Sequence, residues 1–293
     1  MNVSEDQLAS WSQAPSETED QKCLTAISAV GDALRARFGN SVKLIRQGSH
    51  TNRTNIRADS DVDVVALHTG YYFGDTAFLS AADKSRYEQN FVAADYSFAQ
   101  YKNDVEQALR SVFGDAVNRR NKCLRVNGGW NRTTADVVPA YEHKRFSTYQ
   151  SVSALGIEFV TDQGARIVSF PEQHYANGVR KNDDTRRVFK AAVRILKHVR
   201  NRLAEQRIIV PDSMSSYFVE CLVWNVPNDG FGKSTWREVV ESVTGKIWND
   251  MRNPSIATNY AEVSDLHWLL RGGTRTAQQA EEFMLQAWRH VTQ

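Results

Sequence analysis

The chain has 293 residues, of which 41% are hydrophobic and 24% are charged, and its 36 Lys and Arg residues nearly balance 34 Asp and Glu residues. This composition is that of a soluble globular protein and excludes a disordered chain, a collagen-like rod and a coiled coil. A formal net charge of +2 argues against a protein that coats long nucleic acid by bulk charge, so a basic site must come from local clustering.

Three cysteines, Cys23, Cys123 and Cys221, lie far apart in the sequence and form no CxxC pair. A zinc site and a disulfide framework are therefore not expected, and a reducing compartment fits best. The first 22 residues are polar and acidic, without the apolar core of a signal peptide, and no stretch approaches about 18 uninterrupted apolar residues. We expect a cytoplasmic protein without a membrane span.

The first half of the sequence predicts helices and strands in alternation. Apolar residues at spacings of three and four predict a helix over 18–38, and β-branched runs predict strands over 42–45 and 61–67. A long helix is expected over 83–113. Its candidate inner positions are Phe91, Tyr96, Tyr101, Val105, Leu109 and Val112.

Further strands are predicted over 123–126 and 135–140, and a hairpin is predicted around Thr161-Asp162-Gln163-Gly164. The second half is mostly helical, with candidates over 185–203, 215–225, 234–248 and 276–291. We therefore expect an N-terminal mixed domain over 1–170 and a helical domain over 171–293, with a soft boundary between 165 and 182.

Asp61 and Asp63 lie two residues apart in a predicted strand. Because side chains alternate along a strand, both carboxylates point to one face, where they repel each other unless a cation is present. Magnesium prefers carboxylate and phosphate oxygens, so it is the natural partner. Asp59 continues the same alternation and leaves 59/61 as an alternative pair, but we prefer 61/63 because the apolar run begins there.

The strand predicted over 42–45 ends at the segment Gln47-Gly48-Ser49. A glycine lets the backbone approach a phosphate closely, and the following serine offers a hydroxyl and an N–H group. A helix that started nearby would add exposed N–H groups. This segment predicts a loop that holds a triphosphate while the strand holds metal ions.

Phosphoryl transfer with two metal ions needs a further carboxylate, and Asp136 is the best candidate. It lies in a β-branched run over 134–140 that could pair beside the strand of Asp63. There it would complete the shell of one metal and help to deprotonate an attacking hydroxyl. A DxD pair or a lone strand aspartate is more often a solvated edge residue, but the combination with Gly48-Ser49 favours a catalytic site.

The helix predicted over 185–203 carries seven Lys and Arg residues and no acid. Lys190, Arg194 and Lys197 are spaced four and three residues apart and therefore share a face. This face is either a solvated surface or a set of cations for a polyphosphate or nucleic acid backbone. The absence of acids at i,i+4 favours the second interpretation.

Polar residues flank this helix on both sides. Asn177 could cap the helix, brace its loop or read a base edge, and Asn182 is expected to cap the helix. Ser216 could cap the helix over 215–225 or donate to a phosphate, and Tyr217 could belong to the core or stack on a base.

Taken together, these residues resemble a known family. Gly48-Ser49 with Asp61-Val62-Asp63 and Asp136 resembles the polymerase-β-like nucleotidyltransferase superfamily. From about residue 40 to 230 the chain is similar to the bacterial CD-NTases, the cGAS/DncV-like nucleotidyltransferases related to oligoadenylate synthase. The residues from His174 to Asn201, and those from Ser216 to Pro227, look like the clade E (CdnE-like) branch.

The resemblance implies an α/β (α+β) fold, in which a polymerase-β-like core with a small mixed sheet is followed by a C-terminal helical domain that closes the nucleotide cleft. It implies an enzyme that joins two nucleoside triphosphates, releases two pyrophosphates and forms a cyclic dinucleotide; longer cyclic products also occur in the family. It further implies a product that activates an effector protein in anti-phage (CBASS) defence. No zinc ribbon like that of the animal DNA-sensing enzyme is seen in the sequence, which agrees with the cysteine count.

The resemblance also assigns roles at the matching positions. Asp61, Asp63 and Asp136 would bind two Mg²⁺ ions, with Mn²⁺ as a substitute, and would serve in catalysis. The nucleotide-binding positions would be Gln47, Gly48 and Ser49 for the donor triphosphate, Lys197 and Ser216 for further triphosphate contacts, Tyr217 for base stacking and Asn177 for the base. Asn177 matches a residue that can favour a pyrimidine, which points to a product such as cyclic UMP-AMP.

Two other functions are weighed beside this one. The first is a template-free nucleotidyltransferase that acts on RNA ends; the modest global charge counts against it. The second is a catalytically dead nucleotide-binding or antitoxin-like module, which would have no need of three clustered carboxylates. The expected partners are therefore ATP, UTP or other nucleoside triphosphates and an effector, with no membrane and no long nucleic acid.

Overall fold

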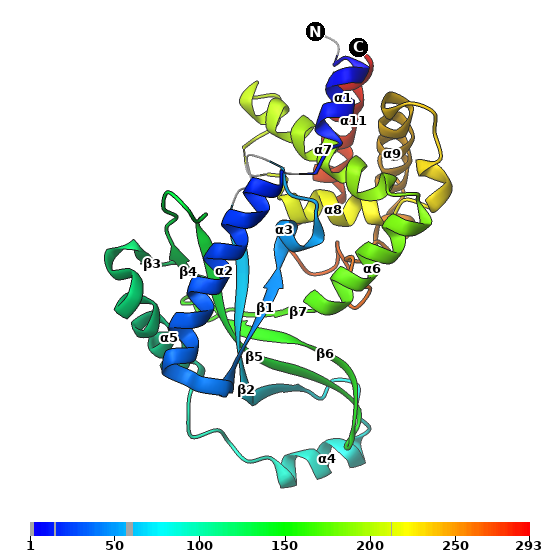
Figure 1. Cartoon of the computed structure of the whole chain (residues 1–293). Coiled ribbons are helices and arrows are strands. Elements are labelled where there is room, and N and C mark those ends of the chain that lie inside the picture. The colour runs from blue at the N-terminus through cyan, green and yellow to red at the C-terminus, as the bar shows by residue number, and fades with distance from the viewer. Residues whose placement is uncertain (1–2, 15, 57–60, 212) are drawn as a thin grey trace. The chain divides into compact units, whose positions relative to one another are not determined.

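The computed structural model describes residues 3–14, 16–56, 61–211 and 213–293 (Figure 1). The chain forms two compact units. The sheet unit comprises Glu17–Gly48 and Ser60–Pro171, and the helical unit comprises Met1–Ser16, Ser49–Asp59 and Glu172–Gln293.

Within the described residues, the sheet unit contains one seven-stranded mixed sheet in the order β1-β2-β5-β4-β3, with β6 paired to β5 and β7 paired to β6. Only the β2–β5 pair is parallel among these pairings. The strands are β1 (Val42–Gln47), β2 (Val62–Asp75), β3 (Val117–Arg119), β4 (Leu124–Val126), β5 (Ala135–Thr148), β6 (Ser151–Val160) and β7 (Arg166–Ser169). The mixed sheet expected from the sequence is confirmed, although β3 was not predicted.

Two helices, α2 (Glu17–Phe38) and α5 (Phe98–Phe113), pack together and cover one face of this sheet (Figure 1). Val62, Val64 and Ala66 of β2 are buried against them, whereas Val65 and Leu67 belong to a second apolar cluster on the other face. Because the side chains of β2 alternate between two buried layers, the strand reads as a nearly continuous apolar run.

The sequence predicted one helix over 83–113, but the structure has two, α4 (Ala81–Asn90) and α5. The break occurs because Ser97 starts a new helix with a capping box. The Ser97 hydroxyl accepts from the Gln100 N–H, and the Gln100 side chain accepts from the Ser97 N–H. This local hydrogen bonding competes with continuation of the helix.

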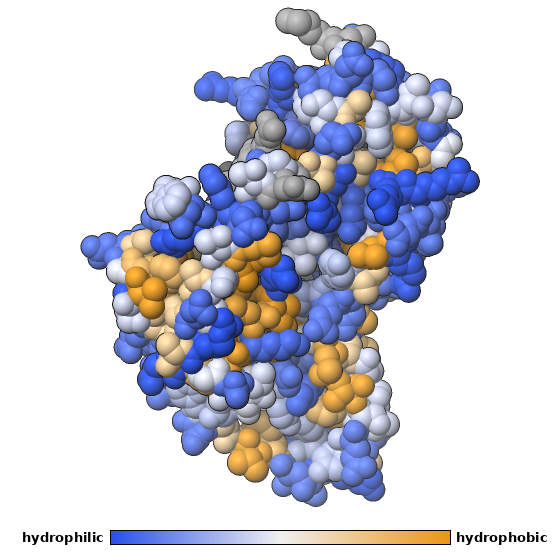
Figure 2. Space-filling view, in the orientation of Figure 1, coloured by the Kyte–Doolittle hydropathy of each residue, from blue (hydrophilic) through white to orange (hydrophobic). Residues whose placement is uncertain are grey.

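The predicted inner positions of this region are confirmed in part. Tyr101, Val105 and Leu109 are buried as predicted, while Phe91 is 54% exposed and Val112 is 59% exposed. Phe91 follows α4 instead of lying inside a helix, and Val112 lies in the last turn of α5. Apolar side chains accordingly reach the surface over α5 and beside α4 (Figure 2).

The helical unit has a single apolar core built around α7. Its helices are α1 (Glu5–Trp11), α3 (Gly48–Asn52, whose first residue belongs to the sheet unit), α6 (Pro171–Asp184, likewise), α7 (Val188–Glu205), α8 (Ser216–Trp224), α9 (Trp236–Met251), α10 (Pro254–Ala257) and α11 (Ala277–Thr292). Capping boxes at Thr235 and Thr276 set the starts of α9 and α11. Short 3₁₀ segments lie at Gly39–Ser41 and Gly114–Ala116 in the sheet unit and at Asn228–Phe231 in the helical unit.

Two N-terminal segments group with the helical unit, whereas the sequence placed all of 1–170 in the catalytic core. The physical reason is apolar burial for α1, since Leu8 and Trp11 lie in the core built around α7. Residues 49–56 are held through Thr54, whose hydroxyl donates to Glu220 of α8. None of the described helices combines the length and the apolar character needed to cross a membrane.

Candidate active site

Asp61 directly precedes β2 and Asp63 lies within it. Since Val62, Val64 and Ala66 face the core beneath α2 and α5, the alternation of the strand directs Asp63 to the opposite face of the sheet. Asp61 lies two residues before Asp63, so the same alternation of side chains directs it to the same face. The alternative acid Asp59 lies outside the described residues.

Asp136 lies on β5, which runs parallel to β2, and its Cα is the register partner of Asp63. Its neighbours Ala135 and Val137 are buried beneath α2 and α5, so Asp136 shares the face of Asp63. The predicted pairing of these two strands is confirmed, and it places two of the three candidate acids side by side.

Gln47 ends β1 opposite Asp63, and Gly48 follows with φ +75°. A Cβ atom at position 48 would overlap the Asp63 carboxylate. Glycine is therefore required here for its left-handed conformation and for its close approach to an acid. Ser49 then lies in the first turn of α3, where its carbonyl accepts the N–H groups of Thr54 at 2.9 Å and Asn55 at 3.2 Å.

A basic residue that the sequence interpretation missed, Arg125 of β4, lies in the same row of the sheet. Its Cα is the antiparallel partner of Asp136. Its guanidinium donates to Oδ2 of Asp61, and its Nε lies 3.3 Å from Oδ1 of Asp136. The sequence does contain a pattern that could have indicated Arg125, because it lies between two apolar residues of a short strand. Side chains alternate along a strand, so the arginine points to the face opposite to that of its apolar neighbours.

Cys123 lies beside the same acids. Burial raises the pKa of its thiol to about 12, and the nearby charges of Asp136 and Asp63 and a hydrogen bond to Asp136 add to this effect. The thiol therefore stays protonated at neutral pH and donates a hydrogen bond to the Asp136 carboxylate, so it lacks the thiolate that a nucleophilic role needs.

The three carboxylates fit magnesium in chemical type, because they are hard oxygen donors. One atom supports this fit: Oδ1 of Asp136 is buried and accepts no hydrogen bond. Such an atom is costly unless a cation or donor faces it. Within the described ranges, no three His, Cys, Asp or Glu side chains stand ready to hold one ion, and Arg125 contacts Asp61 and approaches Asp136 instead.

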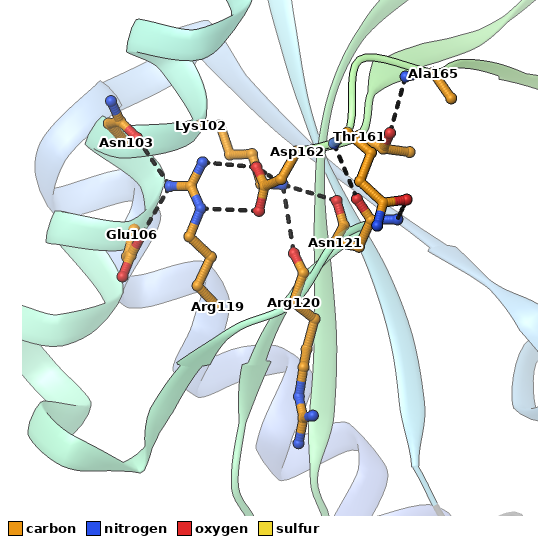
Figure 3. A network of polar contacts seen from close by, with 10 residues as sticks. Lys102, Asn103, Glu106, Arg119, Arg120, Asn121, Thr161, Asp162 and Ala165 are labelled. Atoms are coloured by element: carbon orange, nitrogen blue, oxygen red, sulfur yellow. Dashed lines mark hydrogen bonds and ion pairs between the residues drawn. The ribbon is translucent and has the colours of Figure 1, made fainter.

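A polar network anchors the β3–β4 hairpin, which carries Cys123 and Arg125 (Figure 3). Asp162, in the β6–β7 turn, accepts from two of the three Arg119 nitrogens, at 2.8 and 3.0 Å, and from the Lys102 ammonium at 2.8 Å. Hydrogen bonds from these cations lower the pKa of Asp162 to about 2, although burial acts in the opposite direction. The hairpin is thereby tied to α5 and to the β6–β7 turn.

Replacing Asp162 with asparagine is expected to destabilise the protein by about 1–3 kcal/mol, since the Lys102 ammonium is buried and loses its charged partner. Because the folded pKa lies below the ordinary value of 3.8, the wild-type carboxylate stabilises the fold above pH 4, and this contribution disappears as the pH falls towards 2. Urea unfolding at neutral and acidic pH measures both effects.

The matched control is Asp32→Asn, which breaks an exposed i,i+3 ion pair with Arg35 and should change stability by less than about 0.5 kcal/mol. If Asp162→Asn were as mild as this control, the network would not anchor the hairpin.

The basic face predicted on 185–203 is buried, so its interpretation as a solvated surface is wrong. Lys190, Arg194 and Lys197 are 8%, 7% and 0% exposed. Lys197 Nζ donates to the Thr54 carbonyl at 2.8 Å, and Arg194 Nε donates to the Ser12 carbonyl at 2.8 Å. Burial lowers the pKa of Arg194 to about 10. These cations stabilise backbone carbonyls of the two N-terminal segments.

Glu220 of α8 completes this buried group. It accepts a hydrogen bond from the Thr54 hydroxyl at 2.8 Å, and its other oxygen lies 3.0 Å from Nε2 of His174. Burial raises the pKa of Glu220, but the hydrogen bond and charge of His174 and the charge of Lys197 outweigh it and hold this pKa below the usual value. Lys197 is therefore placed where it positions the chain just after Ser49, and its contact with a triphosphate stays a prediction.

The polar residues around α8 are also engaged. Ser215, not Ser216, caps α8, while the Ser216 hydroxyl accepts from Arg200 at 3.0 Å. The Tyr217 hydroxyl donates to Glu262 at 2.9 Å. The Tyr217 ring centroid lies 5.6 Å from that of His174 and 5.0 Å from the Arg275 guanidinium.

The two asparagines differ in what they support. Asn177 of α6 donates to the Val263 carbonyl at 2.8 Å and accepts from Arg180, so its amide braces the loop at 263. Asn182 Oδ1 accepts from the Lys190 N–H at 3.1 Å in the first turn of α7, which confirms its capping role although Arg187 is the N-cap residue. The base-reading role of Asn177 and the base-stacking role of Tyr217 stay predictions.

Comparison with known proteins agrees with this arrangement. The family model of the cGAS/DncV-like nucleotidyltransferase C-terminal helical domain matches residues 176–292. The cyclic dipurine nucleotide synthase of Elizabethkingia meningoseptica is 46% identical over 292 residues, which cover 99% of each chain. The cyclic dipyrimidine nucleotide synthase CdnE of Cecembia lonarensis is 36% identical over 294 residues, or 98% of each chain.

A solved structure agrees over the full length. The structure of the Elizabethkingia meningoseptica CdnE cyclic dinucleotide synthase with GTP and Apcpp superposes with a TM-score of 0.85 at 44% identity and covers 100% of both chains. The chain therefore belongs to the bacterial CD-NTase family of cGAS/DncV-like nucleotidyltransferases, in its clade E branch, and is a nucleotidyltransferase.

Proposed function

We propose that this enzyme is a cyclic dinucleotide synthase that joins two nucleoside triphosphates by successive phosphoryl transfers and releases two pyrophosphates. The observation that carries the proposal is the adjacency of Asp63 and Asp136 on parallel strands, with Gly48 against the Asp63 carboxylate. The relatives that match over nearly their whole length are named as cyclic nucleotide synthases, which supports the same reaction here.

Asp61, Asp63 and Asp136 would hold two Mg²⁺ ions, with Mn²⁺ as a substitute. When bound, these ions lower the pKa of the attacking ribose hydroxyl and offset charge that develops on the phosphoryl oxygens. Asp136 would also help to take the proton of that hydroxyl. The protonated Cys123 thiol leaves nucleophilic attack to the substrate hydroxyl.

The remaining residues would orient the donor nucleotide. Gln47, Gly48 and Ser49 would place the chain against the triphosphate, and this path is set by the left-handed Gly48 and by the bonds from Thr54 and Asn55 to the Ser49 carbonyl. Lys197 and Ser216 would contact the triphosphate, and Tyr217 would stack on a base. Correct orientation of two reactants can supply much of the rate of such a transfer.

The bases of the two nucleotides that are joined depend on the residues that contact them. The two relatives above are named for dipurine and dipyrimidine products, so overall similarity does not transfer a base preference to this chain. We propose a pyrimidine-containing product such as cyclic UMP-AMP, on the basis of Asn177. We further propose that the product activates an effector protein in anti-phage (CBASS) defence in the cytoplasm.

The test is incubation of the purified protein with Mg²⁺ and the four nucleoside triphosphates, each α-labelled in turn. Small products that resist phosphatase are expected, together with two pyrophosphates for each cyclic dinucleotide. Extension of added RNA alone would replace the proposal with an RNA-end transferase. Absence of turnover with both Mg²⁺ and Mn²⁺ would favour a nucleotide-binding module.

Replacing Asn177 with serine is expected to shift incorporation from UTP towards purines by about 10-fold, since the amide is lost as a hydrogen-bonding group. Competition between labelled ATP, GTP and UTP measures the shift. The control is Arg180→Gln, which removes the neighbour of the Asn177 amide but leaves that amide in place. An unchanged product mixture in the serine variant would remove Asn177 from base selection.

A further inference from the structure

One row of residues crosses four strands at the level of the candidate metal site. Gln47 on β1 is the register partner of Asp63 on β2, Asp63 is the partner of Asp136 on β5, and Asp136 is the partner of Arg125 on β4. The row thus places the Arg125 guanidinium at the end of an acidic cluster. The proposed reaction gives this positive charge no role.

The guanidinium is held by the acids themselves. Arg125 donates to Asp61 and approaches Asp136 at 3.3 Å, and the side chains of these three residues are 30%, 42% and 26% exposed. Clustered carboxylates repel each other when partly removed from water, so one positive charge among them lowers the free energy of the metal-free protein.

The contact of Arg125 with Asp136 is an ion pair without a hydrogen bond. Arg125 Nε and Asp136 Oδ1 are both buried and form no hydrogen bond, although they lie 3.3 Å apart. Arg119 on the neighbouring strand provides the contrast, because it holds Asp162 through two nitrogens at 2.8 and 3.0 Å. Arg125 therefore leaves an acceptor of Asp136 unsatisfied and can withdraw from it at little cost in hydrogen bonds.

We propose that Arg125 is a resident countercation of the acidic cluster, which stabilises Asp61 and Asp136 in the metal-free protein and competes with divalent cations for them. Arg125 is thus a positioning residue that sets the metal affinity of the site. This inference rests on the proposed function, in that it takes Asp61, Asp63 and Asp136 to be the metal ligands.

The test is a titration of nucleotide-free protein with Mn²⁺, followed by electron paramagnetic resonance of the free ion. Arg125→Gln is expected to bind Mn²⁺ more tightly, on the order of tenfold, because a positive charge close to the ion is removed. Arg125→Lys keeps the charge and should stay within about threefold of the wild type. Arg120→Gln removes the same charge from the nearby β3–β4 turn and should leave the affinity unchanged.

Stability gives a second readout. Without metal, Arg125→Gln is expected to unfold at a lower temperature than the wild type, and saturating Mn²⁺ should raise its melting temperature by more than it raises that of the wild type. If this variant does not fold without metal, Arg125→Met replaces it, with the same expected gain in Mn²⁺ affinity because the positive charge is again removed.

The outcomes separate the two ideas. Unchanged or weaker Mn²⁺ binding by Arg125→Gln would overturn the role of Arg125, while the proposed metal site would stand if Asp136→Asn abolishes binding. If Asp136→Asn bound Mn²⁺ as tightly as the wild type, the proposed metal site itself would fail.

Discussion

Replacing Asp61 and Asp63 together with asparagine is expected to lower the rate of nucleotide turnover by about three orders of magnitude or more, because the amides cannot supply the negative charge that two metal ions need. The fold should survive. The Asp61 side chain is 42% exposed, and Asp63 lies on the face of β2 that the α2–α5 core does not cover. Initial rates with α-labelled nucleotides measure the loss, and near-ultraviolet circular dichroism checks the fold.

A control for this prediction is Asp115→Asn, which removes an exposed carboxylate from the turn after α5 and should leave turnover unchanged. Activity that survives in the double variant would show that the wrong acids have been assigned. In that case Asp59, the alternative partner in the strand alternation, would be the next residue to replace.

The second large effect is expected from Gly48→Ala. The left-handed backbone at φ +75° costs an alanine about 1–2 kcal/mol, and the new methyl group overlaps the Asp63 carboxylate. Asp63 or the Gln47–Ser49 backbone must then move. Because a displacement of about 1 Å at a reacting centre can cost about 100-fold, we expect turnover to fall by at least that factor.

Gly39→Ala is the matched control. Gly39 has a similar φ of +57°, but nothing lies within 4 Å of the position of its Cβ. This variant should lose comparable stability in urea unfolding and keep its activity. If the two alanine variants kept equal turnover, the close approach of Gly48 to Asp63 would be irrelevant to catalysis.

Much of the fold follows from local patterns in the sequence, namely apolar spacing and β-branched runs. Apolar spacing predicted α2 and α7 to within a few residues, and β-branched runs predicted the first halves of β2 and β5. The prediction of a single helix over 83–113 was wrong because apolar periodicity does not detect the capping box at Ser97. The extensions of β2 and β5 beyond their apolar runs depend on pairing between strands and not on propensity.

The candidate site shows the same division. The types and spacing of Gly48, Asp61 and Asp63 already indicated metal-dependent chemistry, because alternation along one strand is a local property. The partners of Arg125 and the burial of Lys197 could not be inferred, since a cation in a sequence carries no sign of the carboxylate or carbonyl that it contacts.

The sequence by itself determined which residue types were available for phosphoryl transfer and which strand faces they occupy. Only the tertiary structure decided that Asp136 is the neighbour of Asp63, that Arg125 contacts the acids, and that Lys190, Arg194 and Lys197 are buried. The physical reason is that strand order and register, and the packing of distant segments, bring together groups far apart in the chain, and no local periodicity records such partners.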